Sequence, residues 1–236
     1  VVHNQPMREA LIDCGFVARK QVSALGCLRM DAFLERITAG APNAVQRRKK
    51  VVLFSFVHTA GLYSITTQSF PPNRDFGFVR LFEDCHAEIA RLALERPDVD
   101  FVIKPKWAGG AWQMEIERAV RTTGVELQDI PNLAVSPDVN VHDLILTSDV
   151  TIGFASTALL EAGIAGKPVV MPLFHEATDE KYKDYLVLAD GASDLFLVAR
   201  SPEEYRALIL GALDNSGVSG EMMKRREEAF ERLVTP

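Results

Sequence analysis

One stretch of the chain combines residue types that bind phosphate and sugar. Residues 148–168 read SDVTIGFASTALLEAGIAGKP. We expect a buried strand that ends at Gly153, followed by a tight turn that brings Ser156 and Thr157 to the start of a helix. Their hydroxyls and several unpaired backbone N–H groups would then converge where the helix dipole is positive. Such a helix start is a natural phosphate site.

Glu161 lies on the same predicted helix, about one turn beyond Thr157. A carboxylate there could accept hydrogen bonds from both hydroxyls of a ribose, while Ser156 and Thr157 hold the phosphates of the same nucleotide. The residues also fit an ordinary helix cap followed by a surface glutamate. The residues alone therefore leave a nucleotide site and a purely structural role open.

Two lysines, Lys104 and Lys106, follow a strand predicted at 100–103. Parallel sheets bind ligands beyond the carboxyl ends of their strands, and lysine offsets phosphate charge as a point charge. We therefore predict Lys104 and Lys106 as donor-binding residues. A solvated loop is the alternative.

Two histidines and a glycine complete the candidate site. His58 and Gly61 lie in the long segment after a strand predicted at 51–57, and loops of this length in compact domains are often functional. His58 is the candidate catalytic base, and Gly61 is a candidate donor-binding position. His142 opens a short predicted helix, where it could face a nucleotide base, and the neighbouring Asp143 is the expected cap. Either histidine could instead be a packed structural residue.

The elements that must position these residues alternate between strand and helix. This pattern predicts an α/β fold, a Rossmann-like, doubly wound parallel sheet with helices on both faces. The predicted strands span 51–57, 100–103, 133–135, 150–153, 168–171 and 195–198. The predicted helices span 76–95, 112–122, 141–146, 156–165 and 221–234, with one more beginning at 202.

Charge and composition divide the chain near residue 50. The first 50 residues hold nine Lys or Arg and four Asp or Glu, whereas the whole chain has a net charge of −6. We predict a remnant of an N-terminal domain or interdomain segment at 1–38, a linker at 39–50, and a Rossmann-like nucleotide-binding domain at 51–236. Within 1–38 we expect a helix near 6–13, a strand near 22–25 and a helix that begins near Asp31.

Composition excludes several classes of protein. The 236 residues are 47% hydrophobic and 25% charged, which is typical of a globular domain. No apolar run is long enough to span a membrane, and the acidic balance disfavours nucleic-acid binding. The three cysteines are far apart and form no CxxC motif, which indicates free buried thiols in a reducing cytoplasm. The GxGxxG, GxxxxGK[ST] and GxSxG motifs of other α/β enzymes are absent.

Together these residues resemble the C-terminal half of GT-B glycosyltransferases, in particular the CDP-glycerol glycerophosphotransferases and related capsule or surface-carbohydrate transferases. The resemblance extends more distantly to UDP-N-acetylglucosamine 2-epimerases and covers about residues 4–200. It is carried by the donor-binding pattern in 148–168 and by Gly26-Cys27-Leu28-Arg29-Met30-Asp31, which is similar to an interdomain segment of such proteins. Lys106 stands where the CDP-glycerol group often has His, and Glu161 where it commonly has Asp.

The resemblance implies that Ser156 and Thr157 bind the donor diphosphate and that Glu161 binds the ribose. It also implies that Lys104 offsets the negative charge of the leaving nucleoside diphosphate. It implies a nucleotide-activated sugar or glycerol as substrate, surface polysaccharide as product, and no cofactor or metal. The acceptor and general base would come from an N-terminal domain, so we expect this chain to bind nucleotide but turn over poorly. The expected location is the cytoplasm, at the inner face of the membrane through peripheral association. A non-catalytic nucleotide-sugar module and an epimerase half are the alternatives.

Overall fold

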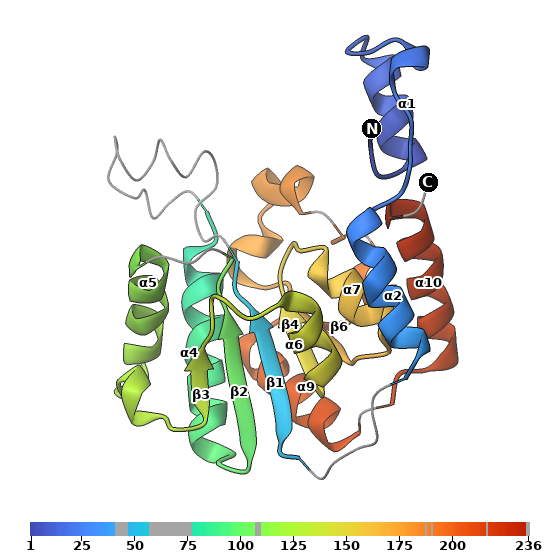
Figure 1. Ribbon diagram of the computed structural model, residues 1–236. Helices are drawn as coiled ribbons and strands as arrows, with labels where there is room; N and C mark the ends of the chain where they lie inside the picture. Colours follow the sequence, from blue (N-terminus) through green and yellow to red (C-terminus); the bar gives the residue numbers. More distant parts are fainter. Residues whose placement is uncertain are drawn as a thin grey trace.

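The structure, a computed structural model, describes residues 1–40, 47–56, 77–106, 110–186, 188–189, 191–215 and 217–234 (Figure 1). Six strands form one parallel sheet in the order β3-β2-β1-β4-β5-β6. They are β1 (Lys49–Phe54), β2 (Val99–Lys104), β3 (Leu133–Val135), β4 (Val150–Gly153), β5 (Val169–Pro172) and β6 (Leu197–Ala199). The predicted α/β, Rossmann-like fold is confirmed.

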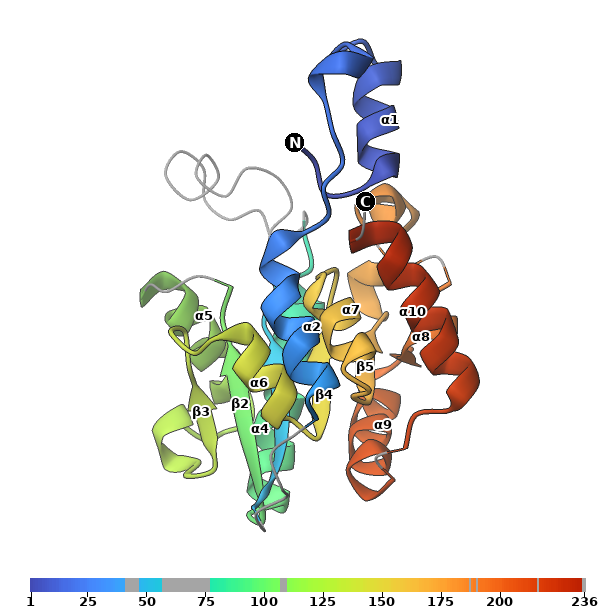
Figure 2. The ribbon, with the colours of Figure 1, turned by 45° about the vertical axis from the view of Figure 1, so that its right-hand side comes forward.

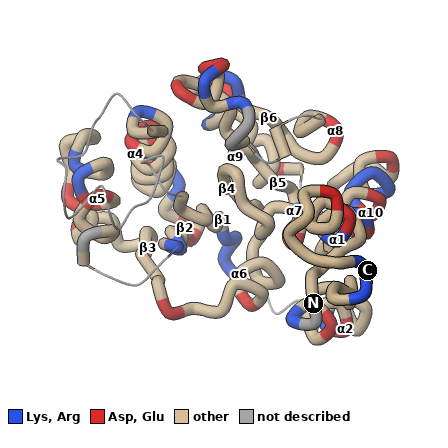
Figure 3. Tube along the Cα trace, turned by 90° about the horizontal axis from the view of Figure 1, so that it is seen from above, with Lys and Arg blue, Asp and Glu red and all other residues tan. Residues whose placement is uncertain are grey.

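Helices cover both faces of the sheet (Figure 3). The α-helices are α1 (Gln5–Asp13), α2 (Asp31–Thr38), α4 (Val79–Glu95), α5 (Gly110–Arg121), α6 (Val141–Thr147), α7 (Ala158–Ile164), α8 (Ala192–Leu195), α9 (Pro202–Asp214) and α10 (Gly220–Val234). Short 3-10 turns lie at Arg19–Gln21, Leu28–Met30, Leu127–Asp129, His175–Thr178 and Glu180–Tyr185. Helices α4 and α9 lie on one face, and α6 and α7 lie on the other. In the described part of the chain, no helix has the length and apolarity needed to cross a membrane.

The strand order places a reversal of winding between β1 and β4. From β1 the chain passes through α4 to β2 and through α5 to β3, and it then returns through α6 to β4 on the other side of β1. At such a reversal the connections leave the two central strands in opposite directions, so a crevice opens beyond their carboxyl ends. The fold therefore places any ligand site beyond Phe54 and Gly153.

The central strands are buried on both faces. Val51, Val52, Leu53 and Phe54 of β1 are all buried, and so is every residue of β4. Strands covered by helices on both sides need such continuous apolar runs. The run at 51–54 is therefore the sequence signal that predicted this strand, which begins at Lys49, two residues earlier than expected.

The N-terminal segment splits into a projecting part and a packed part. Helix α1 stands away from the sheet, beside the end of α10 (Figure 2). By contrast, Met30 and Phe33 are 2% and 1% exposed and belong to the main core. The strand expected near 22–25 is a single bridge between Val2 and Ala24. The segment is too short to supply a partner strand of its own.

Three local expectations were wrong. Helix α7 begins at Ala158 rather than at 156, with Thr157 as its N-cap residue. Strand β6 begins at Leu197 rather than at 195, because α8 extends to that position. Of the three cysteines, Cys85 is buried, but Cys27 is partly exposed and Cys14 is exposed.

A buried arginine ties the C-terminal helix to α7. Arg226 is 1% exposed, and its guanidinium donates to the carbonyl oxygens of Leu195 at 2.7 Å, Lys167 at 2.9 Å and Gly163 at 3.4 Å. Burial lowers the pKa of Arg226 to about 10. The carbonyl groups at the end of a helix carry partial negative charge, so this cation caps the end of α7.

A close approach at Gly153 sets the position of α7. A Cβ atom on Gly153 would lie 2.8 Å from Leu159 Cδ2. We therefore expect Gly153→Ala to lower the free energy of unfolding by about 1–3 kcal/mol, as overpacking of a core does. Urea denaturation would measure this loss. Gly211→Ala is the control: nothing lies within 4 Å of a Cβ there, so it should add about 0.5–1 kcal/mol through helix propensity. Equal effects of the two substitutions would contradict the close contact.

Candidate functional site

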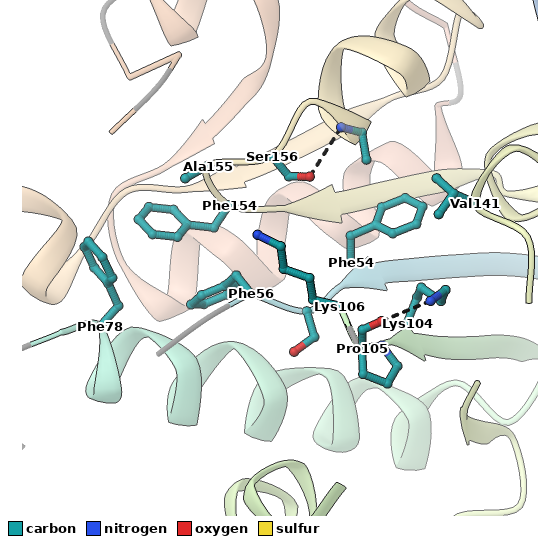
Figure 4. Close-up of a pocket in the computed structure, with 12 residues that line it drawn as sticks. Phe54, Phe56, Phe78, Lys104, Pro105, Lys106, Val141, Phe154, Ala155 and Ser156 are labelled. Carbon is teal, nitrogen blue, oxygen red and sulfur yellow. Dashed lines mark hydrogen bonds between the residues drawn. The ribbon is translucent and has the colours of Figure 1, made fainter. Parts of the chain in front are cut away.

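A cavity of about 290 Å³ lies beyond the carboxyl ends of β1, β2 and β4, where the strand order reverses (Figure 4). Aromatic rings and two lysines line it. The lining residues are Phe54, Ser55, Phe56, Phe78, Lys104, Pro105, Lys106, Val141, Phe154, Ala155, Ser156 and Ala158. Three of the predicted donor-binding residues, Lys104, Lys106 and Ser156, are thus brought together.

The two lysines differ in their surroundings. Lys104 Nζ donates to the carbonyl oxygens of Pro105 at 3.0 Å and Pro137 at 2.7 Å. Burial lowers the pKa of Lys104, against the opposing effect of Asp138. Lys106 is exposed and extends its amine into the cavity in Figure 4. One anchored and one exposed cation therefore border the same space.

The turn between β4 and α7 borders the cavity through Ala155 and Ser156. Ala155 has a φ of 46°, a conformation that is costly for a residue with a side chain. Ser156 Oγ accepts a hydrogen bond from the amide of Ala158 at 3.3 Å, whereas the exposed Thr157 makes no side-chain cap. The amides of Ala155, Ser156 and Thr157 make no hydrogen bond to any other described residue. The turn therefore has donors available for an anion.

The start of α4 does not offer a comparable site. The Glu176 carboxylate accepts hydrogen bonds from the amides of Arg80 and Leu81 at 2.9 and 3.0 Å. A carboxylate of the chain itself thus occupies the position that a phosphate would take at this helix start. Backbone amides without an acceptor among the described residues lie instead in the turn before α7.

Glu161 lies beside the cavity but does not line it. It is 3% exposed, and Arg29 Nη2 donates to its Oε1 at 2.5 Å. Burial alone would lower the pKa of Arg29, but the attraction of Glu161 and contacts with Cys27 outweigh it, and the pKa is raised. The predicted ribose carboxylate is therefore already paired with a residue 132 positions away in the sequence.

His142 is held on the other side of Glu161. Its Nε2 lies 3.3 Å from Glu161 Oε2, and its ring stacks on Phe33 with centroids 4.2 Å apart. The cap of α6 is Asn140, whose side chain accepts from the amides of His142 and Asp143. The expectation that Asp143 forms this cap was wrong, since Asp143 pairs with Arg36 at 2.7 Å.

Both ends of the 148–168 motif have structural roles. Asp149 accepts from the amide of Lys50 and from Arg47. Lys167 Nζ donates to the carbonyl oxygens of Leu146 at 3.0 Å and Ser148 at 2.8 Å, which caps α6. Only the middle of the motif therefore reaches the cavity.

A buried polar network under the cavity was not predicted. Ser55 Oγ lies 2.9 Å from His86 Nε2 and accepts from Trp112 Nε1 at 3.2 Å. His86 Nδ1 lies 2.6 Å from the carbonyl oxygen of Phe82, which places a proton on Nδ1 and leaves Nε2 to accept from Ser55. The network fixes the end of β1. Its sequence signal was Ser55, a polar residue that interrupts an apolar run.

The remaining predicted residues, His58 and Gly61, lie outside the described residues. Among the described residues, no three His, Cys, Asp or Glu side chains gather as ligands of a metal ion.

Comparisons with known structures identify the fold. A point variant of the wall teichoic acid polymerase TagF superposes with a TM-score of 0.51 at 17% identity, covering 98% of this chain and 52% of that protein. TagF itself gives a TM-score of 0.50 at 15% identity, again covering 98% of this chain and 52% of that protein. A proposed UDP-N-acetylglucosamine 2-epimerase from Listeria monocytogenes gives 0.50 at 14% identity, covering 98% of this chain and 54% of that one.

The chain therefore shares its fold with part of these structures and spans about half of their length. No protein-family model and no curated protein sequence matches it. The expected GT-B resemblance is thus confirmed for the fold, and the narrower CDP-glycerol assignment stays a prediction.

The structural role of Lys167 can be tested directly. We expect Lys167→Met to lower the free energy of unfolding by about 1–2 kcal/mol, because two carbonyl groups at the end of α6 lose a charged donor. Chemical denaturation would measure the change. Lys224→Met is the control, since its side chain is 77% exposed, and it should leave stability almost unchanged. If Lys167→Met is as mild as the control, Lys167 is not a cap.

Proposed function

We propose that this chain binds a nucleoside-diphosphate-activated sugar or glycerol and serves as the donor half of a transferase for surface polysaccharide synthesis. The single observation that carries the proposal is the cavity at the reversal of strand order. It is lined by Lys104, Lys106 and the turn residues Ala155 and Ser156, whose amides make no hydrogen bond to another described residue. Two cations and a set of backbone donors suit the two negative charges of a diphosphate.

The size of the cavity suits a site that a second half of the protein completes. Small-molecule sites usually have volumes of about 300–1,000 Å³, and this cavity of 290 Å³ lies at the bottom of that range. It can hold the diphosphate but not a whole activated sugar. We assign the acceptor and the rest of the catalytic machinery to a second half of a GT-B protein, and we keep His58 as the candidate base.

The chemistry proposed for this half is electrostatic. When the bond to the transferred group breaks, negative charge builds up on the departing nucleoside diphosphate. Lys104, Lys106 and the amides at the start of α7 would stabilise that charge, and preorganised donors of this kind are effective in transfer reactions. No step in this proposal uses a metal.

A thermal-shift panel with CMP, CDP, UDP, GDP and ADP tests the proposal. A ligand at about a hundred times its dissociation constant adds roughly 2.7 kcal/mol to stability, and this should raise the midpoint by several degrees. We expect at least one diphosphate to shift the midpoint more than CMP does. Calorimetric titration should then show that Lys104→Met and Lys106→Met each weaken binding by about tenfold.

Lys224→Met, on the exposed face of α10, is the control and should bind like the wild type. The proposal fails if none of the five nucleotides stabilises the protein. It also fails if Lys104→Met and Lys106→Met bind as tightly as the control.

A further inference from the structure

The hydroxyl group of Ser55 has one bonding position left for a ligand. Ser55 is 7% exposed and lines the cavity just beyond the end of β1. Its Oγ lies 2.9 Å from His86 Nε2 and accepts from Trp112 Nε1 at 3.2 Å. A hydroxyl has one proton to donate and two lone pairs that can accept. Two of these three positions are therefore taken by His86 and Trp112.

The direction of these bonds decides what the third position can bind. His86 Nδ1 lies 2.6 Å from the carbonyl oxygen of Phe82. A carbonyl oxygen can only accept, so the neutral imidazole carries its proton on Nδ1 and accepts at Nε2. The Ser55 proton is thus directed at His86, and one lone pair accepts from Trp112. The position left on Ser55 Oγ is a lone pair, which can bind only a group that donates.

The other polar groups of the lining have the opposite character. Lys104 and Lys106 carry only N–H donors (Figure 4). The amides of Ala155 and Ser156 make no hydrogen bond to another described residue and are donors as well. Phosphate oxygens are acceptors, so they match these donors and would be repelled by the lone pair of Ser55. The cavity therefore offers donors to an anion and, at Ser55, an acceptor to a different part of the ligand.

A ligand that matches both features carries a donor group close to its diphosphate. Nucleotide-activated sugars have the diphosphate on C1 and commonly a hydroxyl or an acetamido N–H on C2. Activated glycerol likewise has a hydroxyl on the carbon atom next to the one that bears the diphosphate. A cavity of 290 Å³ can hold this part of the ligand together with the diphosphate.

We propose that Ser55 accepts a hydrogen bond from the C2 substituent of the transferred group and so selects ligands that carry an O–H or N–H donor there. The inference rests on the proposed function, since it concerns the same cavity and the same ligand. Ser55 touches the ligand, whereas His86 is a positioning residue that keeps the Ser55 proton turned away from it. A C2 substituent without a proton would leave this lone pair unpaired or facing another acceptor.

The inference predicts discrimination at C2. UDP-glucose is compared with UDP-2-deoxy-2-fluoroglucose, and CDP-glycerol with its 2-deoxy-2-fluoro analogue. Fluorine is close to a hydroxyl in size but cannot donate. In each pair that the wild type binds, the hydroxyl compound should bind about tenfold more tightly, as a lost hydrogen bond predicts. Ser55→Ala should remove this preference and should bind UDP and CDP, which lack the transferred group, as the wild type does.

Ser148→Ala is the matched control for Ser55→Ala. It makes the same chemical change at a buried serine, whose Oγ lies 3.0 Å from Thr151 Oγ1. Ser148 is not among the residues that line the cavity. This variant should therefore keep the full preference for the hydroxyl compound.

The positioning role of His86 is tested by His86→Phe. The new ring can keep the packing on Phe82, whose ring centroid lies 3.9 Å from that of His86. The Ser55 proton then has no acceptor at this position and can turn toward the cavity. The hydroxyl and fluoro compounds should therefore bind this variant about equally, while its affinity for UDP and CDP should stay that of the wild type.

Calorimetric titration gives each affinity, and thermal melts show that each variant is folded. Equal binding of the two members of a pair by the wild type, a comparison that needs no variant, would overturn the inference. A preference that survives in Ser55→Ala would overturn it too, and one that survives in His86→Phe would overturn the positioning role. If UDP or CDP binds but neither activated compound does, this inference fails alone. If no nucleotide binds, the proposed function fails as well.

Discussion

The two central strands of the sheet have no face open to water, and that constraint decides where the polar groups of the candidate site lie. Strands β1 and β4 are buried on both sides by helices. Polar groups are few along such strands, because an unpaired polar group in a dry interior is costly. They gather at the carboxyl ends of the strands, where the lysines, the amides of the α7 turn and the Ser55–His86 network meet. The candidate site lies at the carboxyl ends because burial of the central strands leaves little room for polar groups elsewhere along them.

Much of this arrangement could be predicted from local patterns. The apolar runs at 51–54 and 150–153 predicted central strands, and the position of Lys104 directly after a strand predicted that it would border a crevice. The spacing of apolar residues in α4 predicted its buried face. These predictions succeed because each depends on neighbouring residues and on a sheet geometry that varies little between proteins.

The rest depends on contacts between distant parts of the chain. Nothing near Glu161 in the sequence indicates that Arg29 reaches it, and nothing near His142 indicates a stack on Phe33. The cap of α6 was assigned to Asp143, whereas Asn140 begins the helix one turn earlier and leaves Asp143 for Arg36. Lys167 shows a related difficulty: a residue inside a motif that suggests ligand binding caps a helix of its own chain.

The buried Arg226 has a consequence for the order in which the protein can be completed during synthesis. Helix α7 leaves the ribosome about sixty residues before Arg226 does, yet the carbonyl groups at its end are satisfied by that arginine. Until α10 emerges, the carbonyl oxygens of Gly163 and Lys167 lack this charged donor, although the amides of Gly166 and Lys167 already close the end of α7. A nascent chain can thus assemble its sheet early, whereas α7 gains its contact with Arg226 only after α10 has emerged.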